Sequence, residues 1–180
     1  MKSIASALIA GAALFSAQAV QAQQNCASPA DFDDTLRYAM PLIYEAAMSR
    51  CGDQYSANGF MKSQGPDFAD GFRAMQDDAW PGTMRLIKTV LANGGDSSEA
   101  EQVGMLFNTI PADALRPFVD AMVVQKVAEE IKPDSCAKIE QGVELIAPLP
   151  PENVTGLLTF LVSQIKRDEG KFCIAEATGE

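Results

Sequence analysis

Apolar residues recur at every third or fourth position along most of this chain, and this spacing restricts the fold more than any other feature. The clearest stripe follows Pro111 and consists of Leu115, Phe118, Val119, Met122, Val123, Val127 and Ile131. That spacing is the period of an α-helix that buries one side. Sustained alternation of apolar and polar residues, which is typical of a half-buried strand, does not occur. We therefore predict an all-α fold.

Further helices are indicated by the same periodicity and by helix-start chemistry. Ser28 followed by Pro29 predicts a cap and a proline in the first helical turn. Pro41 lies inside that first segment, where it removes a backbone hydrogen bond, so we expect a kink or a break. The other predicted helices cover residues 68–75, 80–91, 98–107, 134–146 and 154–165. The prediction is a single-domain irregular bundle of six to eight helices over residues 23–180.

The first 22 residues have the layout of a secretory signal peptide. Lys2 precedes an apolar run from Ile4 to Phe15, and small residues before position 22 suit cleavage after Ala22. The run is shorter than the roughly 20 apolar residues that span a bilayer, and no later segment approaches that length. We expect residues 1–22 to be removed and the protein to be periplasmic or secreted, without a membrane span.

All four cysteines follow the predicted signal. They are Cys26, Cys51, Cys136 and Cys173. An even number in an exported chain predicts two disulfides. Cys136 precedes and Cys173 follows two predicted helices that are joined by the short segment 147–152. Because so short a connection favours antiparallel neighbours, we predict a Cys136–Cys173 bridge.

The remaining pair, Cys26 and Cys51, conflicts with a continuous first helix. Such a helix would hold the two residues about 33 Å apart at a rise of about 1.5 Å per residue, whereas bridged Cα atoms lie within about 7 Å. Either the chain folds back near Pro41 and the two cysteines pair, or they do not pair with each other. We prefer the fold-back, because free thiols are a liability in an oxidising compartment.

Several kinds of chemistry are excluded or unsupported. The chain has no histidine, so imidazole cannot serve as base, nucleophile or metal ligand. The net charge of −10 argues against a nucleic-acid partner. Ser135 and Lys138 have the Ser-x-x-Lys spacing of penicillin-binding enzymes, but the other elements of that site are missing, so we interpret Ser135 as a helix cap. We expect no catalytic site, no cofactor and no bound metal.

Three groups of residues remain as candidates for binding. The acidic group Asp31, Asp33 and Asp34 suits a helix start, with a calcium site as the alternative. Surface ion pairs account for the arginines, and an arginine cage for a small dicarboxylate is the alternative; they are Arg37, Arg50, Arg73, Arg85, Arg116 and Arg167. Seven methionines after Met1 suit core packing or an adaptable apolar groove.

Two short stretches resemble small exported helical proteins of Gram-negative bacteria. They are Arg50-Cys51 and the segment from Ala147 to Asn153, which reads APLPPEN. The resemblance extends loosely over residues 23–180. It implies a periplasmic helical domain, and because the group is functionally unassigned it implies no site residue.

Together these features favour a helical protein that acts by binding. The expected partner is an envelope protein or peptide, or a small apolar ligand. The alternative is a small helical enzyme that uses carboxylate and arginine groups on an anionic metabolite or a cell-wall substrate.

Overall fold

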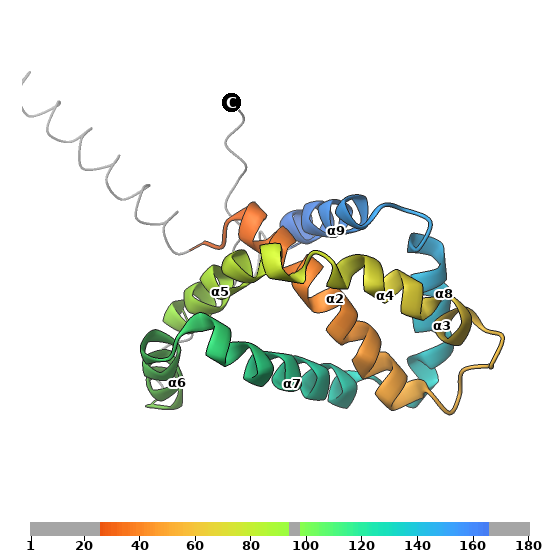
Figure 1. Ribbon diagram of the computed structural model, residues 1–180, viewed down its shortest axis with the longest axis horizontal. Coiled ribbons are helices and arrows are strands. Elements are labelled where there is room, and N and C mark those ends of the chain that lie inside the picture. Colours follow the sequence, from red (N-terminus) through yellow and green to blue (C-terminus); the bar gives the residue numbers. More distant parts are fainter. Residues whose placement is uncertain (1–25, 94–97, 166–180) are drawn as a thin grey trace, which may run out of the picture.

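The computed structural model describes residues 26–93 and 98–165. Every regular element in these ranges is a helix, which confirms the all-α prediction (Figure 1). In chain order they are α2 (Pro29–Cys51), α3 (Phe60–Ser63), α4 (Gly65–Arg73), α5 (Gln76–Asn93), α6 (Ser98–Thr109), α7 (Ala112–Glu130), the 3-10 turn η1 (Pro133–Ser135), α8 (Cys136–Ile146) and α9 (Pro151–Ile165). The predicted signal segment, residues 1–22, lies outside the described residues.

The start of α2 follows the sequence prediction. The Ser28 hydroxyl accepts a hydrogen bond from the Asp31 backbone N–H at 3.0 Å, and Pro29 occupies the first turn. The predicted fold-back near Pro41 is wrong, because α2 continues through this proline to Cys51. Pro41 is itself buried, so packing offsets the hydrogen bond that the ring removes.

Helix α2 is the central element of the fold and crosses the molecule diagonally in Figure 1. It contacts α4, α5, α7, α8 and α9. Tyr38 and Leu42 of α2 pack with α5, α6 and α7 in one core cluster. Ala47 and Cys51 belong to a second cluster with α3 and α8. Met40 joins α4 and α9 in a third.

One disulfide is seen among the described residues, and it differs from both predicted pairs. Cys51 at the end of α2 is bonded to Cys136 at the start of α8, with their Cα atoms 5.6 Å apart. The predicted Cys26–Cys51 and Cys136–Cys173 bridges are therefore wrong. Cys26 is not free, and Cys173 lies outside the described residues.

Helix packing explains why the predicted pairing failed. A continuous α2 holds Cys26 and Cys51 at its opposite ends. The chain turns by 117° between α8 and α9, which is less than the reversal of an antiparallel hairpin. Helix α9 instead packs on α2 and α4, while α8 crosses near the end of α2 and brings Cys136 to Cys51 (Figure 1).

Within residues 26–93 and 98–165, no single helix combines the length and the low polarity needed to cross a bilayer. Residues Pro133–Ile146 and Pro151–Gln164 meet that criterion only when taken together, as a pair with the 117° bend.

Candidate functional site

The most elaborate cluster of polar and aromatic side chains surrounds Arg116. The guanidinium carbon of Arg116 lies 5.3 Å from the centroid of the Tyr38 ring and 5.8 Å from that of Trp80. The two rings lie 4.9 Å apart and are tilted by 35°. An arginine at such distances is attracted to the negative face of an aromatic ring. Tyr38 and Trp80 thus form a platform on which the guanidinium is mounted.

Hydrogen bonds connect this platform to acidic side chains. The Arg116 Nη1 donates to Asp77 Oδ1 at 2.6 Å, and the Tyr38 hydroxyl donates to Asp120 Oδ1. Gln76 Nε2 donates to the Tyr38 carbonyl oxygen at 2.9 Å. Burial, and then the hydrogen bond to Asp120, raises the pKa of Tyr38 well above its ordinary value. The hydroxyl therefore remains protonated and acts as a donor at neutral pH.

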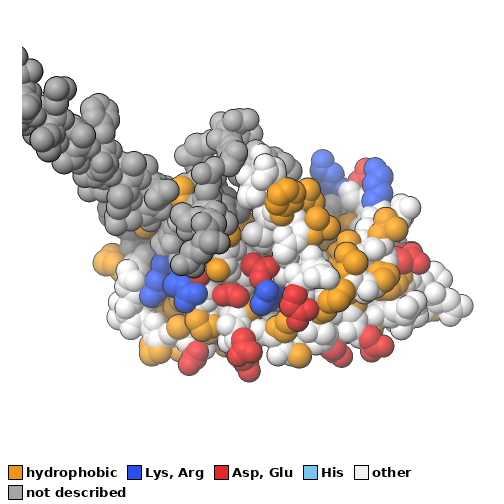
Figure 2. Space-filling model, turned by 90° about the horizontal axis from the view of Figure 1, so that it is seen from above, with side chains coloured by type: hydrophobic (Ala, Val, Ile, Leu, Met, Phe, Trp, Pro, Cys, Tyr) orange, Lys and Arg blue, Asp and Glu red, His pale blue; other side chains and the backbone are white. Residues whose placement is uncertain are grey.

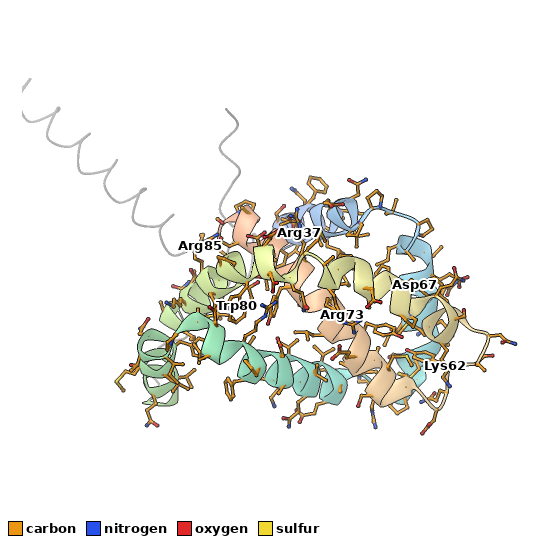
Figure 3. All side chains as sticks on the ribbon, viewed as in Figure 1. Arg37, Lys62, Asp67, Arg73, Trp80 and Arg85 are labelled. Atoms are coloured by element: carbon orange, nitrogen blue, oxygen red, sulfur yellow. A yellow bond between two sulfur atoms is a disulfide. The ribbon has the colours of Figure 1, made fainter. Side chains whose placement is uncertain are left out.

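Three helices assemble the cluster. Tyr38 comes from α2, Trp80 and Asp77 come from α5, and Arg116 comes from α7. Trp80 extends from α5 toward the space between α2 and α7 (Figure 3). Asp120 follows Arg116 by four residues, so both side chains lie on the same side of α7. The spacing of Arg116 and Asp120 and the single tryptophan can be read from the sequence. No local pattern indicates that Arg116 contacts Tyr38 and Trp80.

Trp80 also presents an unused hydrogen-bond donor. Its side chain is 4% exposed, and its indole N–H has no acceptor among the described residues. A buried donor without a partner costs about 1–3 kcal/mol. The stacking of Arg116 on Tyr38 and Trp80, together with this donor, makes the platform the candidate binding site.

The other predicted arginines are used mainly in ion pairs. Arg85 pairs with Asp31, Arg37 with Asp33, and Arg73 with Glu45 and Asp70. The Arg50 Nε donates to the Ile131 carbonyl oxygen at 3.2 Å, near the end of α7. These contacts agree with the ion-pair interpretation, and Figure 3 shows Arg37, Arg73 and Arg85 at separate places. Arg167 lies outside the described residues.

The acidic side chains at the start of α2 pair with arginines or pack against α5. No group of three or more cysteine, aspartate or glutamate side chains that could hold a metal ion occurs in the described part of the chain. Asp31 and Asp33 are instead paired with arginines. Asp34 lies against α5, where a Cβ atom added to Gly82 would come within 2.1 Å of Asp34 Oδ2. The absence of a side chain at Gly82 therefore allows this close approach.

We expect Asp34→Asn to raise the thermal unfolding midpoint at pH 7. Burial is the largest cause that raises the pKa of Asp34 above its ordinary value of 3.8. The charged carboxylate thus destabilises the folded state at pH 7, and protonation removes this cost as the pH falls toward and below 3.8. The advantage of the asparagine variant should shrink over the same pH range. The measurement is the unfolding midpoint of both proteins between pH 3 and pH 7.

Asp53→Asn serves as the matched control, because it removes the same charge from an exposed position. It should have little effect on the midpoint at pH 7. The expectation fails if Asp34→Asn is no more stable than the unsubstituted protein at pH 7.

The Ser-x-x-Lys pair shows no sign of activation. Ser135 precedes α8, but its hydroxyl makes no capping hydrogen bond, so the predicted side-chain cap is wrong. Lys138 is exposed on α8. The 3-10 turn η1 accounts for this difference, because it starts the helical path before Ser135 and leaves that residue in a helical conformation.

Large apolar side chains are exposed on several helices, and α9 carries three of them. Leu157, Phe160 and Leu161 are exposed, with Phe160 at 59%. Their spacing of three and four residues places them on one side of the helix, which we call the α9 face. The adjoining side of α9 packs into the core through Val154 and Leu158. Figure 2 shows hydrophobic side chains reaching the surface between charged ones.

Exposed apolar residues elsewhere are Val90, Val103, Met105, Leu106, Phe118, Met122, Leu145 and Leu149. Of the methionines, Met40, Met61 and Met84 are buried, and Met48 and Met75 are partly buried. These five methionines therefore serve in core packing.

The comparisons with known proteins place the chain in no established group. No family model, no curated protein and no solved structure matches this sequence or this fold. The class defined by the structure is an all-α protein with a buried disulfide between α2 and α8.

Proposed function

We propose that this protein acts by binding a protein partner in an oxidising compartment outside the cytoplasm, and that the α9 face is the contact surface. The observation that carries the proposal is the exposure of Leu157, Phe160 and Leu161 beside the buried stripe of Val154 and Leu158. Large apolar side chains that gather on one part of the surface mark sites of interaction with other proteins. The α9 face therefore has the composition of an interface.

The shape of this surface favours a macromolecular partner over a small apolar ligand. Small-molecule sites are concave and enclose most of the ligand. The α9 face is the outer side of a helix, which is convex and fits a groove or a second helix of another protein. Glu152 is the only charged residue in α9, so contact with an apolar partner would bury little charge.

The compartment is part of the same proposal. The Cys51–Cys136 disulfide is buried in a core cluster, and structural disulfides persist in oxidising environments. The N-terminal segment with signal-peptide layout supports the same compartment. A periplasmic partner would meet the protein there.

The test is photo-crosslinking in the native cell with a benzophenone amino acid at position 160. We expect one discrete adduct, because Phe160 would contact the partner directly. The adduct should disappear when Leu157→Gln and Leu161→Gln are added. These substitutions should leave the unfolding midpoint nearly unchanged, because both leucines are exposed.

A probe at Lys88, which is exposed on α5, provides the control. The same amino acid there should not give the adduct. The proposal is wrong if position 160 gives no discrete adduct, or if positions 160 and 88 give the same one.

A further inference from the structure

The guanidinium of Arg116 has N–H donors that are not used in the hydrogen bond to Asp77. An arginine side chain carries five N–H donors in a planar fork. The hydrogen bond to Asp77 uses Nη1, and the Tyr38 hydroxyl is the other close polar neighbour. The guanidinium is therefore held in position, yet it can still accept a planar anion that offers two oxygens.

The ion pair between Asp77 and Arg116 is weak. Its side chain is 88% exposed, and it belongs to the first turn of α5, where the backbone does not need to move for the side chain to rotate away. Ion pairs with so exposed a partner contribute little, because water and salt compete for both charges. A carboxylate from solution could thus replace the one that Asp77 supplies.

The platform beneath Arg116 would keep its geometry during such an exchange. Tyr38 and Trp80 are buried in the core cluster of α2, α5 and α7, and the Tyr38 hydroxyl is tied to Asp120. Arg116 would therefore remain mounted on both rings after Asp77 leaves.

We propose that Arg116, mounted on Tyr38 and Trp80, is a binding site for a carboxylate that displaces Asp77. The carboxylate of Asp77 already binds Arg116, so the geometry around the guanidinium suits a carboxylate ligand. A singly charged anion fits better than a dianion, because the site has one guanidinium and the carboxylate of Asp120 is bound to the Tyr38 hydroxyl of the same platform. The carboxylate could belong to a small organic acid or to the C terminus of a peptide. The site is separate from the α9 face and does not depend on the function proposed for it.

The single tryptophan allows a direct test on the full chain. Trp80 is the only tryptophan, so its indole N–H gives one NMR cross-peak, and its fluorescence reports this site alone. Sodium acetate is titrated against sodium chloride at constant ionic strength. We expect a saturable shift of the indole peak with acetate and none with chloride.

Two neighbouring acids provide a matched pair of variants. Asp77→Asn removes the competing carboxylate and should tighten acetate binding by roughly twofold to fivefold, the range expected for loss of an exposed ion pair. Asp78→Asn makes the same charge change one residue away, at an exposed position, and should leave the affinity unchanged. Arg116→Gln should abolish the saturable shift, with circular dichroism confirming that the helices remain.

Tetra-alanine with a free C terminus and its C-terminal amide distinguish the two sources. Tighter binding of the free peptide than of acetate, with no binding of the amide, assigns the site to peptide C termini. Equal binding of the free peptide and acetate assigns it to small carboxylates. The proposal is overturned if no ligand gives a saturable shift in either the unsubstituted protein or Asp77→Asn. It is also overturned if Asp77→Asn and Asp78→Asn respond alike.

Discussion

Replacing Cys51 and Cys136 together by alanine is expected to lower the free energy of unfolding by about 4–5 kcal/mol. The two residues are 85 positions apart in the sequence, and the entropy that a crosslink removes from the unfolded chain grows with the length of the closed loop. Alanine leaves no buried thiol and no buried hydroxyl at either position. Urea unfolding followed by circular dichroism measures the change.

The loss should first appear in the helices that this disulfide connects. Cys51 and Cys136 pack with Met61 of α3 in one core cluster, so hydrogen exchange should accelerate in α3 and α8 before α5 and α7. Peptide mapping under non-reducing conditions gives a separate check and should recover Cys51 linked to Cys136. A loss below about 1 kcal/mol, or a map that joins Cys51 to another cysteine, would contradict the structure.

Phe72→Ala should destabilise the protein by about 3–5 kcal/mol, the usual cost of truncating a buried phenylalanine. Phe72 is 1% exposed, and it packs with Met40 of α2 and Val154 of α9. Its truncation leaves a cavity where α4, α2 and α9 meet. Chemical denaturation measures the effect, and α9 should show the largest gain in hydrogen exchange.

The same substitution at an exposed position separates burial from residue type. Phe118 on α7 is 52% exposed, and Phe118→Ala should change the free energy of unfolding by no more than about 0.5 kcal/mol. If the two phenylalanine variants lose similar stability, then Phe72 does not have the core position described above.

Most helices were predictable because their signals are local. The stripe on residues 111–131 and the Ser28–Pro29 start depend only on neighbours within a few positions, and α7 and α2 follow them. The start of α5 was less accurately predicted. The sequence predicts a helix over residues 80–91, whereas α5 begins at Gln76 and contains Pro81. Burial of Ala79 and Trp80 against α2 and α7 favours this longer helix.

The candidate site could not be predicted in the same way. Arg116 was recognised as one of several arginines, but its contacts with Tyr38 and Trp80 join residues that lie far apart in the chain. The α9 face could not be predicted from the sequence either. Its leucines have the same helical period as buried ones, and only the packing of α9 on α2 determines which side remains exposed.

The amino-acid pattern was sufficient to establish the helical class, the approximate helix positions and the absence of imidazole chemistry, because each depends on composition or on short-range periodicity. Disulfide pairing, the aromatic platform and the exposed side of α9 depend instead on how the helices cross. A continuous α2 and the 117° turn between α8 and α9 brought Cys51 to Cys136. Those crossings result from side-chain packing between distant segments, and no local pattern in the chain encodes them on its own.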